Sequence, residues 1–230
     1  MALSSGNWIL ASLPKEEIEH LQPHLESVPV RLNEIIYSVG DPVRYCYFPE
    51  NCVISLLIVM QNGETVEVCM IGREGLVGVL EILGAGRSSN LVLVQVPGNC
   101  WRIRRDTLYR EFKRGGILHD RMLRYTRNVL AQISQTAACN RVHRLEQRFC
   151  RWLLIAHDRA QRDRFPMTHE FLSHILGTPR SEVTLAAGVL RKAGYIQYQR
   201  GQITILDRKG LESAACECYQ ILQHNLVLSG

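Results

Sequence analysis

The fold of this 230-residue chain is decided by residues 165–212, which read FPMTHEFLSHILGTPRSEVTLAAGVLRKAGYIQYQRGQITILDRKGLE. Thr168 suits the N-cap of a first helix, which Gly177 ends because a glycine commonly follows the last helical turn. Thr178 as N-cap and Pro179 at the first helical position open a second helix that reaches about residue 193. Residues 195–198 and 203–206 then predict two strands around the turn 199–202. Two short helices joined through a glycine, followed by a hairpin, are typical of a winged helix-turn-helix.

The second predicted helix has two different faces. Val183, Ala186, Ala187 and Leu190 share the face that we expect to pack inward. The opposite face carries Arg180, Ser181, Thr184, Leu185 and Gly188, which are mostly small or polar. A recognition helix enters the major groove with its first turns, so bulk is excluded there and donors are presented. We expect Arg180 to contact a guanine through both arms of its guanidinium, with Ser181, Thr184 and Leu185 beside it.

Further DNA contacts are expected outside this helix. Thr168 and His169 lie at the start of the preceding helix, where backbone amides help to hold a phosphate. Arg200 lies at the tip of the predicted hairpin and would contact the DNA backbone as part of the wing. Together these residues predict binding to double-stranded DNA.

Charge is divided unevenly along the chain. Residues 1–100 carry a net charge of −6 and residues 101–230 a net charge of +11, which suggests a polyanionic partner for the second part. Arginine suits phosphate and guanine recognition, and only four of the 27 basic residues are lysine. A GC-rich genome would also favour arginine, and that explanation stays open. The longest apolar stretch, residues 52–60, is shorter than the roughly 20 residues that span a membrane.

The first part of the chain has the pattern of an antiparallel β-structure. Between residues 35 and 103, short apolar runs alternate with turn residues, and Asn62-Gly63 predicts a hairpin between runs 53–60 and 65–71. Residues 14–25 predict a short helix before these strands. With the helical second part, this pattern predicts an α+β protein that contains an antiparallel sandwich or roll.

A long helix is predicted between the two parts, from about residue 108 to residue 138. Apolar or small residues recur there at alternating steps of four and three, namely at Met122, Thr126, Val129, Ile133 and Thr136 or Ala137. This seam is typical of a coiled-coil contact and predicts dimerisation through Met122, Val129 and Ile133. A helix that faces the core of its own domain is the alternative. The predicted domains are residues 1–107, 108–140 and 141–230, and the last begins with a helix over 144–160.

These segments resemble the CRP/FNR superfamily of bacterial transcription regulators. Residues 165–212 are similar to its C-terminal winged helix, the N-terminal strands to its cyclic-nucleotide-binding-like β-roll, and residues 108–138 to its dimerisation helix. The stretch TAACNRVHRLEQRFCRWLLIAHDR (136–159) and CECY (216–219) look like a recurrent subgroup. The resemblance implies a homodimer that binds a palindromic operator, a signal sensed by the β-roll, and contact with RNA polymerase if the protein is an activator. The family's three outward positions on the recognition helix are Arg180, Ser181 and Leu185 here, so we expect an operator that departs from the best-known sites.

The resemblance also suggests where an effector would bind. The family's phosphate cassette has a Gly-Glu pair followed by Arg-Ser or Arg-Thr, and the nearest match is Gly78-Val79 with Arg87-Ser88. Val79 cannot accept a hydrogen bond from the ribose, and an unpaired buried hydroxyl costs about 1–3 kcal/mol. We therefore expect no tight binding of cyclic AMP. Gly78, Arg87 and Ser88 remain candidates for holding another anion, with Ile133 and Ser134 of the long helix as further ligand contacts; a simple exposed turn is the alternative for Arg87.

No cofactor, metal or catalytic residue is predicted. The oxygen-sensing members of the superfamily carry N-terminal cysteines, whereas none precedes Cys46 here. On one helix, Cys216 and Cys218 would point about 200° apart and would chelate poorly, so a capping or packing role is expected. His169-Glu170 and His174 miss the zinc-protease spacing HExxH, and no phosphate-binding or hydrolase motif occurs. The eight cysteines lack CxxC pairs, and a reducing cytoplasm is the expected compartment.

Two other functions stay open at the level of sequence. One is a ligand-binding signalling module whose basic helices contact a protein partner instead of DNA. The other is a redox or haem sensor, for which His20, His24 or a cysteine could supply a haem ligand.

Overall fold

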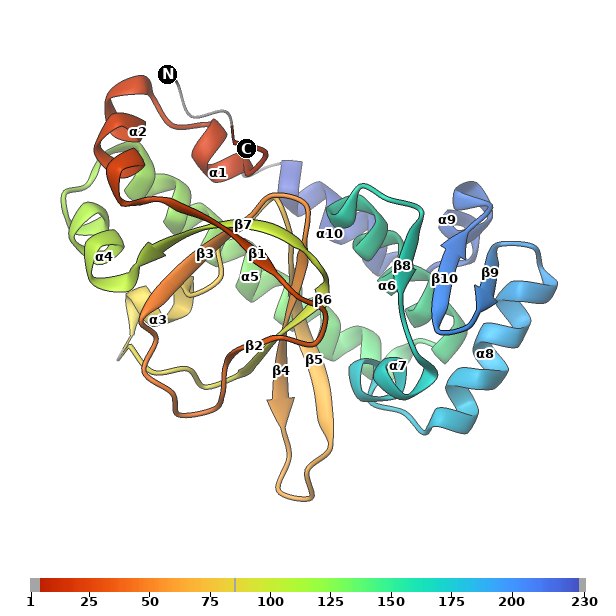
Figure 1. Ribbon diagram of the computed structural model, residues 1–230. Helices are drawn as coiled ribbons and strands as arrows, with labels where there is room; N and C mark the ends of the chain where they lie inside the picture. Colours follow the sequence, from red (N-terminus) through yellow and green to blue (C-terminus); the bar gives the residue numbers. More distant parts are fainter. Residues whose placement is uncertain (1–4, 85, 228–230) are drawn as a thin grey trace.

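The computed structural model describes residues 5–84 and 86–227 (Figure 1). The predicted α+β class is confirmed: antiparallel sheets fill the N-terminal half, and helices dominate the C-terminal half. The predicted first and last domains run to the chain ends, where residues 1–4 and 228–230 lie outside the described residues. No helix among the described residues has both the length and the apolar character needed to cross a membrane.

The N-terminal half is a β-roll of two antiparallel sheets. One sheet has the order β1 (Glu26–Val30), β7 (Gly98–Arg104), β3 (Tyr45–Pro49), and the other β2 (Ile35–Tyr37), β6 (Leu91–Val96), β4 (Val53–Val59), β5 (Thr65–Ile71). Short helices accompany them: α1 (Trp8–Ala11), α2 (Lys15–Leu21), a 3-10 turn (Gln22–His24) and α3 (Val79–Leu83). The predicted hairpin is present: β4 and β5 pair antiparallel, and Gly63 in the turn between them has a φ of 85°. Both sheets contribute to one core, in which Phe48, Ile54 and Ile103 are fully buried.

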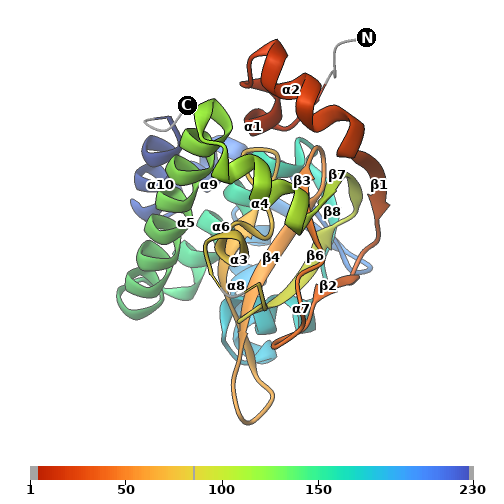
Figure 2. The ribbon, with the colours of Figure 1, turned by 90° about the vertical axis from the view of Figure 1, so that its left-hand side faces the viewer.

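The helical connection consists of two helices. α4 (Arg105–Lys113) is separated from α5 (Gly116–Val142) by Arg114 and Gly115, and Gly115 and the first residue of α5, Gly116, have φ values of 79° and 85°. Glu17 from α2 caps α5, since its carboxylate oxygens accept from the backbone amides of Ile117 and Leu118, each at 2.7 Å. Figure 2 shows α5 running along one side of the β-roll.

The prediction that the seam of α5 faces a partner chain is wrong. Met122 and Val129 are 0% and 2% exposed and belong to the protein's own β-roll core, against which Ile133 also packs. The seam therefore faces inward, as the alternative interpretation held. The outer face of α5 is apolar instead at Leu123 and Leu130, which are 43% and 56% exposed.

The C-terminal half is built around α6 (Leu145–Ala160). It contains a helix pair, α7 (His169–Leu176) and α8 (Arg180–Lys192), and a three-stranded sheet in the order β8 (Arg164–Pro166), β10 (Gln202–Ile205), β9 (Ile196–Gln199). It ends with α9 (Arg208–Ala214) and α10 (Cys218–Val227). Phe149, Leu153 and Val183 lie in its core. The strand β8 did not appear in the sequence pattern.

The premise about the terminal cysteines is also wrong. α9 ends at Ala214, Ala215 is extended with a ψ of 156°, and α10 begins at Cys218. Cys216 therefore lies in a non-helical link, and the 200° separation expected on a continuous helix does not apply.

The two halves share a buried interface. Val53, Met70 and Val96 of the β-roll belong to the same core cluster as α6 and α8. Beside them, Arg159 Nε of α6 lies 2.8 Å from Glu74 Oε1, and both side chains are almost fully buried. Removing one member of such a buried pair costs about 3–5 kcal/mol, because it leaves the other charge without a partner. The β-roll and the C-terminal half are thus joined by specific contacts in this arrangement.

Candidate nucleic-acid interface

The ends of α7 and α8 are fixed by capping residues close to those predicted. Thr168 caps α7, because its hydroxyl accepts from the backbone amide of Phe171 at 3.1 Å, and Gly177 ends the helix with a φ of 58°. One detail differs: Pro179, and not Thr178, is the N-cap of α8. Its ψ of 142° is extended, and its carbonyl accepts the first helical bonds, while the Thr178 hydroxyl donates to Glu182 instead.

The two faces of α8 lie as predicted. Val183, Ala186, Ala187 and Leu190 are buried, whereas the outward residues Arg180, Ser181, Thr184 and Leu185 are exposed. Leu185 is 72% exposed, although leucine is usually buried. The first half of α8 thus exposes one apolar side chain, Leu185, beside several hydrogen-bond donors. This is the form of a surface that another molecule covers.

His169 has a more constrained place than expected. Its ring stacks on Tyr198 of β9, with centroids 4.3 Å apart, and its Nδ1 lies 2.9 Å from the Thr184 hydroxyl. Burial, together with the charge of Arg180, lowers the pKa of His169. A neutral His169 therefore connects α7, α8 and the wing. The phosphate contacts expected of Thr168 and His169 remain predictions.

The wing is a tight hairpin. Arg200 and Gly201 form its two-residue turn with φ values of 50° and 70°, the geometry that matches the twist of flanking strands. Arg200 is exposed at this tip. Its side chain is therefore free to reach past the hairpin, as a wing contact requires.

The residues expected to hold an effector point toward the protein itself. Ser88 is 2% exposed, and its hydroxyl bonds to the Asn90 carbonyl at 2.9 Å and to Glu81 Oε1 at 3.4 Å. Arg87 is exposed and donates to the Gly40 carbonyl at 2.7 Å. Burial raises the pKa of Glu81. A phosphate placed at Ser88 would meet the acceptor oxygens of Glu81, so this region is a poor anion site in the arrangement observed.

The other candidate ligand contacts are Gly78, Ile133 and Ser134, and they lie in different surroundings. Gly78 is buried, with a φ of 97°, and its carbonyl accepts from the Cys46 thiol. Ile133 is half-buried against the β-roll core, and Ser134 is exposed on α5. Their role in ligand binding remains a prediction.

A buried carboxyl group missed by the sequence analysis connects the β-roll to α6. Glu67 of β5 accepts hydrogen bonds from Ser55 at 2.6 Å, from Gln95, and from the Trp152 indole at 3.1 Å. Burial nevertheless raises the pKa of Glu67 to about 7. Only the alternation along β5 could have placed Glu67 on the inner face, and that pattern does not reveal the partner on α6.

The β4–β5 hairpin also reaches the helix-turn-helix. A cavity of about 340 Å³ lies between residues 64–66 of the hairpin and residues 173–179 of the turn region. Gly177 approaches Val66 so closely that an added Cβ would lie 2.9 Å from a Val66 methyl carbon. Glycine is therefore required at this turn both for its φ and for its contact with the β-roll.

Each half of the chain matches the model of a known protein family. Residues 147–214 match the Crp-like helix-turn-helix domain, and residues 27–114 match the cyclic nucleotide-binding domain. The chain belongs to the CRP/FNR superfamily of transcription regulators. This is a family of DNA-binding regulators and not a class of enzymes.

Solved structures of CRP/FNR regulators share the fold of most of the chain. A regulator from Eubacterium rectale is 16% identical, with a TM-score of 0.70 over 91% of this chain and 98% of its own. FixK2 from Bradyrhizobium japonicum is 16% identical, with a TM-score of 0.69 over 84% and 98%. The c-di-GMP responsive regulator CLP from Xanthomonas campestris is 13% identical, with a TM-score of 0.65 over 84% and 100%. Among curated protein sequences, no match was found.

Proposed function

We propose that this CRP/FNR regulator acts as a homodimer that binds a palindromic operator through α8. The observation that carries the proposal is the exposed first half of α8, where Arg180, Ser181, Thr184 and Leu185 face outward above a buried apolar face. The wing supplies Arg200 on the same half of the chain, which has a strongly positive net charge. Phosphate contacts from such a surface would give affinity, and Arg180 would give base preference.

The outer face of α5 supports a dimer of this kind. Leu123, Leu130 and Ala137 are exposed at intervals of seven residues, the spacing that keeps one stripe of a helix against a partner helix. A two-fold axis along this stripe gives two recognition helices, which in helix-turn-helix dimers lie about 34 Å apart, one turn of DNA. RNA polymerase is the further partner if the regulator activates transcription.

The effector of this regulator is proposed to be something other than cyclic AMP. Val79 is buried and has no acceptor for a ribose hydroxyl, and Ser88 is bonded to Glu81 and Asn90. The Xanthomonas campestris relative responds to a different nucleotide, c-di-GMP, so the shared fold does not dictate one ligand.

The first test selects bound sequences from a random pool of DNA duplexes. The second titrates the selected duplex with the protein at several salt concentrations. We expect a palindromic sequence bound by two chains, with an affinity that falls steeply as salt rises, because phosphate contacts release counterions. Arg180→Ala should weaken this binding, whereas Arg31→Ala, which removes an exposed arginine of the β-roll, should not. Failure to enrich any sequence, with a shallow dependence on salt, would favour a protein partner for these helices instead.

A further inference from the structure

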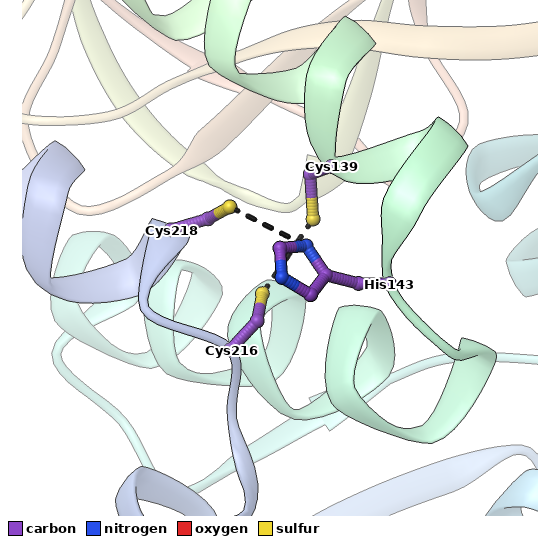
Figure 3. Close-up of side chains that lie close together, drawn as sticks. All are labelled: Cys139, His143, Cys216 and Cys218. Atoms are coloured by element: carbon purple, nitrogen blue, oxygen red, sulfur yellow. Dashed lines mark hydrogen bonds between the residues drawn. The ribbon is translucent and has the colours of Figure 1, made fainter.

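Three cysteines and a histidine meet where α5, α6 and the link between α9 and α10 come together (Figure 3). Cys139 lies in the last turn of α5, and His143 is the C-cap residue that follows the helix, with its backbone amide bonded to the Cys139 carbonyl. Cys216 and Cys218 come from the non-helical link and the first residue of α10. Cys139, Cys216 and Cys218 are 0%, 3% and 1% exposed, and they form a cluster of their own.

The spacing of the four ligand atoms is close to that of a tetrahedral metal site. Cys139 Sγ lies 3.5 Å from Cys216 Sγ, and Cys218 Sγ lies 3.6 Å from His143 Nδ1. All four atoms lie within 4.8 Å of one another. Around a tetrahedral zinc ion, bond lengths of about 2.3 Å to sulfur and 2.0–2.1 Å to nitrogen separate two sulfurs by about 3.8 Å and sulfur from nitrogen by about 3.6 Å.

We propose that Cys139, His143, Cys216 and Cys218 bind one Zn²⁺ ion per chain. Three thiolates and one imidazole in a tetrahedron favour zinc among the common metals. Four protein ligands complete the coordination, which is typical of a structural site and leaves no position for a substrate. A polynuclear iron–sulfur cluster distributes its ligands over several iron atoms and holds them farther apart than this.

Two neighbouring side chains orient the ligands. His143 uses Nδ1 toward the thiols, and its Nε2 lies 3.1 Å from a carboxylate oxygen of Glu217. A carboxylate on the second nitrogen of a zinc-bound histidine fixes the ring and raises its basicity. Gln135 Nε2 donates to Cys218 Sγ at 3.0 Å, which suits a sulfur that carries negative charge.

Two arginines of α6 supply positive charge beside the cluster. Arg151 lies close enough to Cys139 for its charge to act on that thiol, and Arg148 acts on both Cys139 and Cys216. Arg151 is only 5% exposed, and neither arginine has a carboxylate within salt-bridge distance in the described part of the chain. Glu67 acts electrostatically on Arg151 and Glu182 on Arg148, but without direct ion pairs, and a buried cation without close anions is costly. A zinc ion with three thiolates carries a net charge of −1, which these guanidinium groups would balance.

The position of the site gives zinc a structural role. It would tie the end of the long helix to the C-terminal link, across the junction at which α5 passes into α6. Arg148 also donates to the Leu176 carbonyl at the end of α7, so the contacts around the site continue into the helix-turn-helix. Binding would release the thiol protons and involve no oxidation or reduction. The proposal depends on these contacts and not on the DNA-binding function.

The metal content of the purified full-length chain, measured after dialysis, is the first test. We expect one zinc per chain. We also expect that, after chelation under reducing conditions, added Co²⁺ restores one equivalent of a tetrahedral cobalt–thiolate absorption that zinc then displaces. Both measurements use the unaltered chain, so they do not depend on the folding of a variant. Absence of retained zinc together with absence of the cobalt spectrum would overturn the proposal, as would a Cys139–Cys216 disulfide in the chain purified under reducing conditions.

Variants then assign the ligands. Cys216→Ser and His143→Gln should each reduce retained zinc by more than tenfold, and Glu217→Gln should weaken zinc binding by about 10–100-fold as an outer-shell change. The control is Cys100→Ser, because Cys100 is also buried and lies 3.2 Å from another thiol, that of Cys52, but belongs to the β-roll. Circular dichroism at the same protein concentration verifies folding. Equal loss of zinc in Cys100→Ser and Cys216→Ser would show that the cluster is not the site.

Discussion

The recognition helix, which its own sequence pattern predicts, and the phosphate-cassette region of the β-roll, which the family resemblance indicates, have side chains arranged in opposite ways. On α8, Arg180 and Ser181 are exposed and project from a helix whose other face is buried. In the cassette region, Ser88 is buried and bonded to Glu81, and Arg87 is bonded to the Gly40 carbonyl. One surface is ready to meet a partner, whereas the other satisfies its own polar groups.

The difference arises because a recognition helix and an effector pocket depend on different amounts of the chain. A recognition helix needs one amphipathic helix and a glycine turn, which a short stretch of sequence specifies. An effector pocket needs acceptors and donors from distant segments that leave a space between them. In this chain the exposed face of α8 has the arrangement that a recognition helix requires, while the cassette residues bond to groups within the protein.

The largest effect is expected at the outer face of α5. Leu130→Asp places a charge on each side of a two-fold contact, and each lost leucine contact is worth about 1.5–3 kcal/mol. Dimer affinity should therefore fall by at least about 100-fold, and operator affinity with it. Light scattering across a concentration series measures the dissociation. Leu206→Asp is the control, because Leu206 is 60% exposed on the wing side and carries the same change. If Leu130→Asp remains as dimeric as the control, the dimer uses another surface.

The second prediction concerns Glu67, which lies between the two halves. Its pKa, raised to about 7 by burial, means that the folded protein holds a proton that the unfolded chain releases near pH 4.5. Stability should therefore decrease as the pH rises from about 4.5 to 7 and should not change further from this group above pH 7. The size of the decrease is about 3 kcal/mol, since one pKa unit corresponds to about 1.4 kcal/mol.

Glu67→Gln should remove this decrease, so that the variant is more stable than the natural chain at pH 8 and similar to it at pH 5. Denaturant unfolding at both values measures the difference. Glu64→Gln, at an exposed position of the same hairpin, should keep the pH dependence of the natural chain. Identical pH profiles for the natural chain and Glu67→Gln would show that Glu67 is ionised throughout, with its three donors outweighing its burial.

Local features were predictable from the sequence because they depend on residues close together in the chain. Asn62-Gly63 specifies the β4–β5 turn, Thr168 and Gly177 set the limits of α7, and the spacing from Val183 to Leu190 gives the buried face of α8. Each of these rests on a backbone preference or a helical period. Tertiary contacts were not needed to infer them.

Features that depend on distant residues were not predictable. The seam of Met122 and Val129 has the same period whether it faces a partner or its own β-roll, so its direction could not be read from spacing. No glycine or proline marks the break in the helix before Cys216, whose thiol packs with Cys139 from 77 residues earlier. The cysteine–histidine cluster therefore appears only in three dimensions, although Cys139 and His143 already had helical chelate spacing.

The third prediction distinguishes base reading from backbone contact on the DNA side. Arg180→Ala should cost about 1–3 kcal/mol on the preferred operator and relax the preference at one base pair in each half-site. Arg200→Ala at the wing tip should weaken all sequences by a similar factor and reduce the dependence on salt. Binding of both variants to the operator and to each single-base substitution provides the comparison. A uniform loss for Arg180→Ala, with the ranking of sequences intact, would make Arg180 a phosphate contact.

The smallest effect is expected from cyclic AMP. A cyclic nucleotide at the cassette would need an acceptor for its ribose hydroxyl, where Val79 is apolar and 2% exposed, and a free hydroxyl for its phosphate, where Ser88 already bonds to Asn90 at 2.9 Å. Glu81 Oε1, which accepts from the Ser88 hydroxyl, would also place an acceptor oxygen against the phosphate. An unmet ribose hydroxyl alone costs about 1–3 kcal/mol, and the two further conflicts add to that cost. Calorimetry should therefore detect no binding at micromolar concentrations, and cyclic AMP should change operator affinity by less than about twofold, since a ligand shifts an equilibrium only through differential affinity. A micromolar dissociation constant would place the nucleotide on other residues or require the cassette to rearrange around Glu81, and the contrast between an outward DNA surface and an inward effector region would then hold only for the ligand-free chain.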